Sequence, residues 1–263
     1  MSVKAVFFDI DGTLVSFRTH CIPASTLEAV RMLRRRGIKV YIATGRPPVF
    51  IDNLGELEYD GMITTTGAHC LTREGTVLCH RPVPAEDVKR VAAHHLAKPE
   101  DAFPVFFVCD DTVFVTKYTD EVRRVSELLN IQPPPVRPVE QVLGRDVMQI
   151  ISFFPKEEER RYMTELMPGC VSMRWHPSFT DVIARGVSKS AGIDSVLAHE
   201  GIALADTMAF GDGGNDTGML RHVGCGIAMG NASDEVKAVA DYVTDSVDDD
   251  GVARALRRFG LID

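Results

Sequence analysis

The sequence predicts an α/β fold in which a doubly wound parallel sheet is interrupted by an inserted α+β domain. The first third and the last quarter of the 263-residue chain alternate apolar, strand-like runs with helical patterns. This alternation is typical of a parallel sheet with helices on both faces. Residues 81–186 instead pair strand-like runs across short turns and contain three consecutive prolines. We therefore expect a core built from residues 1–80 and 187–263, and a separate domain from residues 81–186.

The composition is that of an ordinary soluble globular protein. The hydrophobic fraction is 45%, the charged fraction is 25% and the net charge is −8. This acidic balance argues against a nucleic-acid partner. No apolar run approaches the ~18 residues that a membrane-spanning helix requires, and the N-terminal segment has no signal-peptide pattern. We expect no membrane partner, no obligate protein partner and a monomer.

The six cysteines contain no C-x-x-C pair, and several lie in apolar runs. They are interpreted as small buried hydrophobic residues of a reduced protein, which favours a cytoplasmic location.

The first predicted strand, residues 3–8, ends on two acids, Asp9 and Asp11. Residues two apart on an extended segment point the same way, so both carboxylates would converge at the carboxyl end of the strand. Gly12 lets the chain turn, and Thr13 adds a hydroxyl. Because neighbouring acids repel unless a cation or a shared proton relieves them, this pair predicts a metal site or acid–base chemistry.

A calcium-binding EF-hand loop is an alternative for the same segment. Counted from Asp9, such a loop needs glycine at its sixth position and glutamate at its twelfth. These positions hold Leu14 and His20, which excludes an EF-hand.

A helix beginning at Pro23 precedes a second strand at residues 38–43, which ends in Thr44-Gly45-Arg46. The Thr44 hydroxyl and the neighbouring backbone N–H groups could hold a phosphate at the start of a helix. Thr44 could equally be only a helix cap. A third strand is expected at residues 62–65.

Lys189 lies in the first turn of a helix predicted from about residue 188 to residue 199. A helix dipole disfavours a cation at this end, so Lys189 indicates an anionic partner. An ordinary surface lysine is the alternative.

The strand predicted at residues 207–210 leads into Gly211-Asp212-Gly213-Gly214-Asn215-Asp216. The glycine spacing is not that of a dinucleotide-binding fingerprint, and acids interrupt it. A glycine turn capped by Asp216 would leave Asp212 unexplained. Beyond it we expect a helix, a strand at residues 225–228, a helix at residues 233–240, a short strand and a C-terminal helix.

Together these segments resemble the four ordered motifs of the haloacid dehalogenase superfamily: residues 9–13, residues 44–46, Lys189 and residues 211–216. The flanks at residues 63–68 and 227–232 look like the Cof-type sugar phosphatase branch, which has a large α/β cap. The resemblance covers essentially the whole chain and implies a Rossmann-like core with an inserted cap. One departure is Thr66, where that branch usually has asparagine, which affects a local loop contact.

The resemblance implies a Mg²⁺-dependent phosphatase of small phosphorylated metabolites, most simply sugar (hexose) phosphates. Asp9 would be the nucleophile that forms an aspartyl-phosphate, and Asp11 the general acid and base. The metal would be held by Asp9, the Asp11 carbonyl and Asp212, with Asp216 orienting the metal shell or Lys189. The groups expected to bind the phosphoryl oxygens are the Ile10 N–H, Thr44, Gly45, Lys189 and Asn215.

The inserted cap is expected to select the leaving group, with Arg46 and Asp181 as candidate substrate contacts. A phosphomutase of the same superfamily is one alternative. A phosphometabolite sensor without catalysis is another, although a sensor has no need of the acid Asp11.

Overall fold

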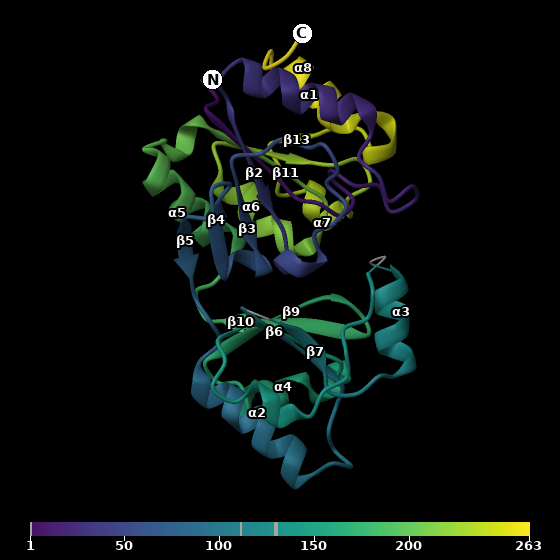
Figure 1. The fold of residues 1–263 in the computed structure, drawn as a ribbon. Helices are drawn as coiled ribbons and strands as arrows, with labels where there is room; N and C mark the ends of the chain where they lie inside the picture. Colours follow the sequence, from purple (N-terminus) through teal and green to yellow (C-terminus); the bar gives the residue numbers. More distant parts are fainter. Residues whose placement is uncertain (1, 111, 129–130) are drawn as a thin grey trace. The chain divides into compact units, whose positions relative to one another are not determined.

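The computed structural model describes residues 2–110, 112–128 and 131–263. The chain divides into two compact units, one made of Met1–Cys79 with Ser188–Asp263 and the other of His80–Val187 (Figure 1). Among the described residues, no helix has both the length and the apolar character that crossing a membrane requires.

The first unit is built on a sheet whose described strands have the order β13-β12-β11-β1-β2-β3-β4-β5. Neighbouring strands from β13 to β3 pair in parallel, and β4 pairs with β3 in antiparallel fashion. The strand bounds are β1 Ala5–Phe8, β2 Lys39–Ala43, β3 Gly61–Thr64, β4 His69–Thr72, β5 Val77–His80, β11 Thr207–Gly211, β12 Cys225–Ala228 and β13 Tyr242–Val243.

The parallel part of this sheet confirms the predicted α/β fold. Strands β4 and β5, which form its antiparallel edge, were not predicted from the sequence. Their segments mix Cys, His and Thr with apolar residues, and β5 is largely exposed, so the alternation that marks a strand is weak there.

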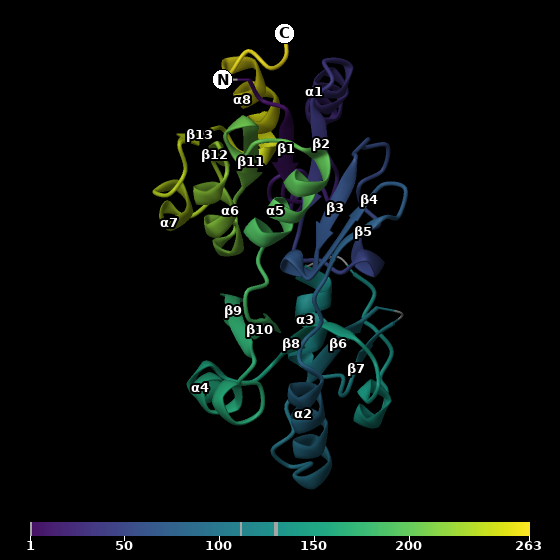
Figure 2. The ribbon, with the colours of Figure 1, turned by 90° about the vertical axis from the view of Figure 1, so that its left-hand side faces the viewer.

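Helices cover both faces of the sheet (Figure 2). On one face lie α1 (Ala24–Arg35) and α8 (Gly251–Arg258). On the other lie α5 (Lys189–Glu200), α6 (Thr217–His222) and α7 (Asp234–Lys237), the last shorter than predicted. Side chains of β1 alternate between the two resulting cores, with Val6 and Phe8 in the first and Ala5 and Phe7 in the second. A strand buried on both faces explains the continuous apolar run before Asp9.

From β1 the sheet continues through β2 and β3 on one side, and from β11 through β12 and β13 on the other. The switch point of the topology therefore lies between β1 and β11. Ala5 is in register with Thr207, and Phe8 with Phe210, whose rings stack at 4.9 Å between centroids. The two strands therefore end side by side, and the residues after them meet at one edge of the sheet. Open α/β sheets bind their ligands at such a switch point.

The second unit contains an antiparallel sheet with the described order β7-β6-β8-β10-β9, which confirms the predicted α+β insert. Helices α2 and α4 contribute to the core of this unit, around Val91, Phe107 and Tyr162. The sequence also predicts a helix from about residue 120 to residue 129; its last residue, Leu129, lies outside the described residues. The bounds are α2 Ala85–Ala97, β6 Val105–Cys109, β7 Val113–Val115, α3 Asp120–Leu128, β8 Val147–Ser152, α4 Lys156–Glu165, β9 Cys170–His176 and β10 Phe179–Ala184.

Short 3₁₀ segments connect several of these elements. They are Pro48–Phe50, Thr65–Gly67, Val139–Val142, Leu204–Asp206, Gly214–Asp216 and Val247–Asp249.

Candidate active site

Lys189 lies at the centre of the residues gathered beyond β1 and β11. Its Nζ is 2.6 Å from Asp9 Oδ1 and 2.6 Å from Asp216 Oδ1, and the residue is 1% exposed. Two internal carboxylates therefore supply the anionic partner that its position at the start of α5 indicates. The alternative of a surface lysine is wrong.

The carboxylates around Lys189 outnumber its single positive charge. Burial opposes the charge on Lys189, but Asp216 and Asp9 together raise its pKa above the ordinary range. Burial also raises the pKa of Asp9 well above its usual value; Lys189 opposes this, while Asp216, Asp212 and Asp11 add to it. Burial, reinforced by the charge of Asp216, raises the pKa of Asp212 to about 7. The site therefore carries excess negative charge that a further cation would relieve.

Asp216 shapes the glycine turn as well as pairing with Lys189. Its Oδ2 accepts hydrogen bonds from the backbone N–H groups of Asp212 at 3.0 Å and Gly213 at 2.9 Å. Both of its oxygens are thus engaged within the protein, and the residue is fully buried. This arrangement favours an orienting role for Asp216.

Asp212 is held from two sides. Thr13 Oγ1 donates to Asp212 Oδ1 at 2.8 Å, and Asn231 Nδ2 lies 3.3 Å from Asp212 Oδ2. The same amide group donates to the Gly12 carbonyl at 2.9 Å, which links the loops after β1, β11 and β12. Sequence reasoning did not assign Asn231 a role; its only signal was its place in the flank at residues 227–232.

Gly12 permits the close approach of these loops. Its φ is +84°, and a Cβ at this position would lie 2.2 Å from Asp212 Oδ2. A side chain there would displace the carboxylate.

A hard divalent cation fits this group of acids. One carboxylate oxygen from each of Asp9, Asp212 and Asp216 can be chosen so that all three lie within 4.8 Å of one another. Carboxylate oxygens are the ligands that Mg²⁺ prefers, and the raised pKa values show that the bare cluster is electrostatically unfavourable. The residues present therefore fit a divalent metal ion held by carboxylates.

The side chain of Asp11 pairs with Arg46. Arg46 Nε donates to Asp11 Oδ2 at 2.6 Å and Nη2 donates to Oδ1 at 2.7 Å. A third donor of the guanidinium, Nη1, binds the Phe50 carbonyl at 2.8 Å. Arg46, which the sequence suggested as a substrate contact, thus has an internal partner, and its contact with substrate stays a prediction.

The segment after β2 lies beside the acids. Thr44 Oγ1 accepts a hydrogen bond from the Arg46 N–H at 3.0 Å, so its hydroxyl does organise the local turn. A Cβ on Gly45 would lie 3.5 Å from Asn215 Nδ2. The Ile10 carbonyl accepts N–H groups of the following turn, which fixes the backbone beside Asp9. The structure thus brings the predicted phosphate-binding segments together; their individual roles stay predictions.

Asp181 belongs to the second unit. It lies buried in β10, opposite Ile151 of β8 and Met173 of β9. Its proposed contact with substrate stays a prediction.

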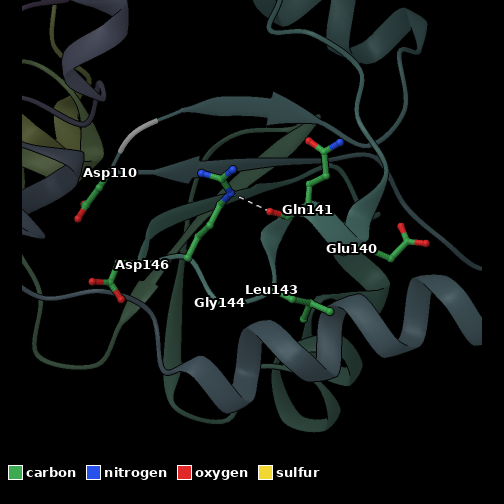
Figure 3. Close-up of a pocket in the computed structure, with 7 residues that line it drawn as sticks. Asp110, Glu140, Gln141, Leu143, Gly144 and Asp146 are labelled. Carbon is green, nitrogen blue, oxygen red and sulfur yellow. Dashed lines mark hydrogen bonds between the residues drawn. The ribbon is translucent and has the colours of Figure 1, made fainter.

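The second unit also has an open pocket of about 540 Å³, lined by Asp110, Glu140, Gln141, Leu143, Gly144, Arg145 and Asp146. Figure 3 shows Asp110 and Asp146 on one side of it and Glu140 on the other. Arg145 Nε donates to the Gln141 carbonyl at 2.8 Å. Because three carboxylates line this pocket, it disfavours a phosphate group.

Comparisons with known proteins agree with this arrangement. A model of the haloacid dehalogenase-like hydrolases matches residues 6–256. The chain is 36% identical to YkrA of Bacillus subtilis (strain 168) over the full length of both chains. It is 29% identical to the 5-amino-6-(5-phospho-D-ribitylamino)uracil phosphatase YitU of the same organism, over 97% of this chain and 96% of YitU.

A solved structure is similar over almost the whole chain. It is that of the HAD subclass IIB sugar phosphatase BT4131, with a TM-score of 0.90 and 43% identity over 99% of this chain and 100% of BT4131. The range that the family model matches, residues 6–256, spans both acid-bearing strand ends and Lys189. The chain therefore belongs to the haloacid dehalogenase-like hydrolase family, as an enzyme of its phosphatase group.

Proposed function

We propose that this enzyme is a Mg²⁺-dependent phosphatase of small phosphorylated metabolites, with sugar phosphates as its main substrates. The observation that carries the proposal is the buried Asp9 carboxylate, paired with Lys189 and adjacent to Asp212 and Asp216. The sugar phosphatase activity in the name of BT4131 supports the substrate class. YitU, which is named for a phosphoribityl compound, supports a small phosphorylated substrate more generally.

Asp9 is the proposed nucleophile. One of its carboxylate oxygens would attack phosphorus and form an aspartyl-phosphate while the bond to the leaving oxygen breaks. Asp11 would give that oxygen a proton. Asp11 would then take a proton from the water that attacks the aspartyl-phosphate, which releases inorganic phosphate and restores Asp9.

Lys189 has two roles in this proposal. Its ammonium group holds Asp9 in place through the 2.6 Å contact, and it offsets the negative charge of an approaching phosphoryl group. Asp216 keeps the ammonium in position from the other side. The backbone at Gly45 and the amide of Asn215 would bind phosphoryl oxygens next to it.

Asp9 and Asp212, with the Asp11 backbone carbonyl, would hold the Mg²⁺. The bound ion would reduce the repulsion between the Asp9 carboxylate and the phosphoryl oxygens. Thr13 and Asn231 would keep Asp212 oriented toward it.

The second unit is proposed as the cap that selects the leaving group, with Asp181 among its contacts. Fold similarity does not determine substrate preference, so this part depends on measurement. The enzyme is further proposed to act as a cytoplasmic monomer.

The test is inorganic phosphate release from a panel of sugar phosphates, nucleotides and other phosphate monoesters, with and without Mg²⁺. We expect Mg²⁺-dependent release that is strongest for sugar phosphates and is lost in Asp9→Asn, although that variant still binds phosphate. Interconversion of isomers without phosphate release would indicate a phosphomutase. Binding without any turnover would indicate a sensor.

A further inference from the structure

The turn between β3 and β4 has an unfavourable backbone conformation. Thr65 and Thr66 have φ angles of +47° and +58°. A positive φ in this range is rare for β-branched residues, because their side chains crowd the backbone there. Strained residues of this kind persist only where surrounding contacts hold them, and they gather at functional sites.

Contacts with the predicted phosphate-binding segments hold this turn. The Thr65 N–H donates to the Arg46 carbonyl and the Thr66 N–H to the Thr44 carbonyl, both at 3.0 Å. On its other side, a Cβ at Gly67 would lie 2.1 Å from the Ser188 carbonyl oxygen, so the turn packs directly against the start of α5. The turn is therefore fixed between the loop after β2 and the residue that precedes Lys189.

The Thr66 side chain is buried without a hydrogen-bond partner. The residue is 1% exposed, and its Oγ1 has no partner within the described parts of the chain. Burying a hydroxyl group without a hydrogen bond is unfavourable, and Thr66 combines this cost with a strained backbone. Thr65 shares both features, so it is the position of the Thr66 hydroxyl beside the predicted phosphoryl site that points to a ligand.

The position of the hydroxyl identifies the ligand. A Cβ on Gly45 would lie 3.5 Å from Thr66 Oγ1 and 3.5 Å from Asn215 Nδ2. The hydroxyl and the amide therefore flank the same space over the Gly45 backbone. Both groups can donate hydrogen bonds, and a charged phosphoryl oxygen is the acceptor that gains most from them.

We propose that the Thr66 hydroxyl donates a hydrogen bond to a phosphoryl oxygen of the substrate, opposite the Asn215 amide and above Gly45. Thr66 is then a substrate-binding residue outside the four family motifs. This inference rests on the proposed function, because it places the transferred phosphoryl group beside Asp9 and Lys189.

The test uses Thr66→Val, which keeps the β-branched shape and removes only the hydroxyl. We expect kcat/KM to fall about 10- to 100-fold and the inhibition constant for vanadate to rise by a similar factor, as for the loss of one donor to a charged oxygen. The melting temperature should stay equal or rise, because the variant no longer buries an unpaired hydroxyl. Thr66→Ser should recover most of the activity.

Thr65→Val is the matched control. Thr65 has the same strained backbone and a buried, unpartnered hydroxyl in the described structure, but it is not among the atoms near Gly45. We expect its kcat/KM to stay within about twofold of wild type, since it loses no contact with the phosphoryl group.

Wild-type kcat/KM and vanadate inhibition in Thr66→Val would overturn the inference. So would a loss of activity with a lower melting temperature that Thr66→Ser does not recover, because the hydroxyl would then be structural. Calorimetric binding of inorganic phosphate separates this inference from the proposed function. If the wild type binds phosphate without turning over any substrate, weaker binding by Thr66→Val supports the inference while the proposed function fails. If wild type and variant bind phosphate equally, or neither binds it, the inference fails.

Discussion

Arg46 binds both carboxylate oxygens of Asp11 through two donors of one guanidinium group, at 2.6 and 2.7 Å. Its third donor is anchored on the Phe50 carbonyl, so the arginine is itself held in one orientation. A two-point contact of this kind fixes the plane of a carboxylate as well as its position. In the proposed mechanism Asp11 carries the proton to and from the leaving oxygen, and Arg46 would determine the direction in which it points.

Arg46→Met should reduce turnover of sugar phosphates about 10- to 100-fold, less than the ~10²–10⁴-fold contribution of a whole general acid–base group, because Asp11 itself remains. Turnover of aryl phosphates should fall less, because departure of their leaving oxygen depends less on protonation. Arg46→Lys should not restore full activity, since an ammonium group cannot form the two-point contact. Steady-state kinetics on both substrate classes would measure this, with Arg31→Met, which removes a surface arginine, as the control. Equal losses on both classes would contradict the positioning role.

Lys189→Met should abolish turnover and destabilise the metal-free enzyme. Removing the ammonium group leaves Asp9 and Asp216 buried without their cation, a change that costs about 3–5 kcal/mol when one partner of a buried pair is lost. Thermal unfolding in EDTA would measure this loss. Lys4→Met removes a lysine of the exposed pair with Asp206 and should change stability by less than about 1 kcal/mol. Similar effects of the two variants would show that the buried pair does not stabilise the fold.

The stability of the metal-free enzyme should depend on the ionisation of Asp212. Burial raises the pKa of Asp212 to about 7 in the folded state, against an ordinary value of 3.8. The folded state therefore binds more protons between these two values, so the contribution of Asp212 to stability is present below pH ~4 and is lost as the pH rises through ~7. Asp212→Asn cannot ionise at this position and so avoids this loss of stability. In EDTA at pH 8 its melting temperature should be higher than that of the wild type.

The difference between Asp212→Asn and wild type should shrink as the pH falls from 8 to 5. Added Mg²⁺ should raise the melting temperature of the wild type, and more so at high pH, because the ion then displaces no proton. Added Mg²⁺ should leave the melting temperature of Asp212→Asn almost unchanged. If the melting temperature of Asp212→Asn were lower than that of the wild type at pH 8 in EDTA, this would contradict the raised pKa of Asp212.

Gly12→Ala should weaken the metal site specifically. Its Cβ would lie 2.2 Å from Asp212 Oδ2 and displace that carboxylate. We expect the Mg²⁺ concentration at half-maximal activity to rise more than about tenfold, as for the loss of a ligand-orienting contact. Gly37→Ala is the control, because Gly37 also has a positive φ, +76°, but nothing lies within 4 Å of its Cβ. Gly37→Ala should lose some stability and keep the wild-type Mg²⁺ dependence; an equal shift in both variants would show that backbone strain alone is responsible.

Local patterns were sufficient to predict the acid-bearing strand ends. One apolar run stops at Asp9 and Asp11, and another stops at Asp212. Each stop indicates the end of a buried strand. Lys189 was noticeable for a similar local reason, because a cation at a helix start conflicts with the helix dipole. The sequence could indicate that Lys189 needs an anion, but it could not indicate which anion.

Local patterns could not predict the hairpin of β4 and β5 or the partner of Arg46. The hairpin segments have mixed polarity, so the strand character of β4 depends on its pairing with β3, and that of β5 on its place beside β4. Arg46 follows a strand end beside the acids, which suggested a contact with substrate. Its choice of Asp11, 35 residues away, depends on β1 and β2 pairing in register.

The sequence by itself determined the α/β fold, the order of its catalytic-type motifs and the presence of an inserted α+β unit. Tertiary structure alone decided the contacts of Asn231 with Gly12 and Asp212, and the burial of the Thr66 hydroxyl beside Gly45. The physical reason is that hydrophobic periodicity and helix caps depend on residues a few positions apart. A hydrogen bond between residues 219 positions apart exists only after the sheet has set which strand ends lie side by side.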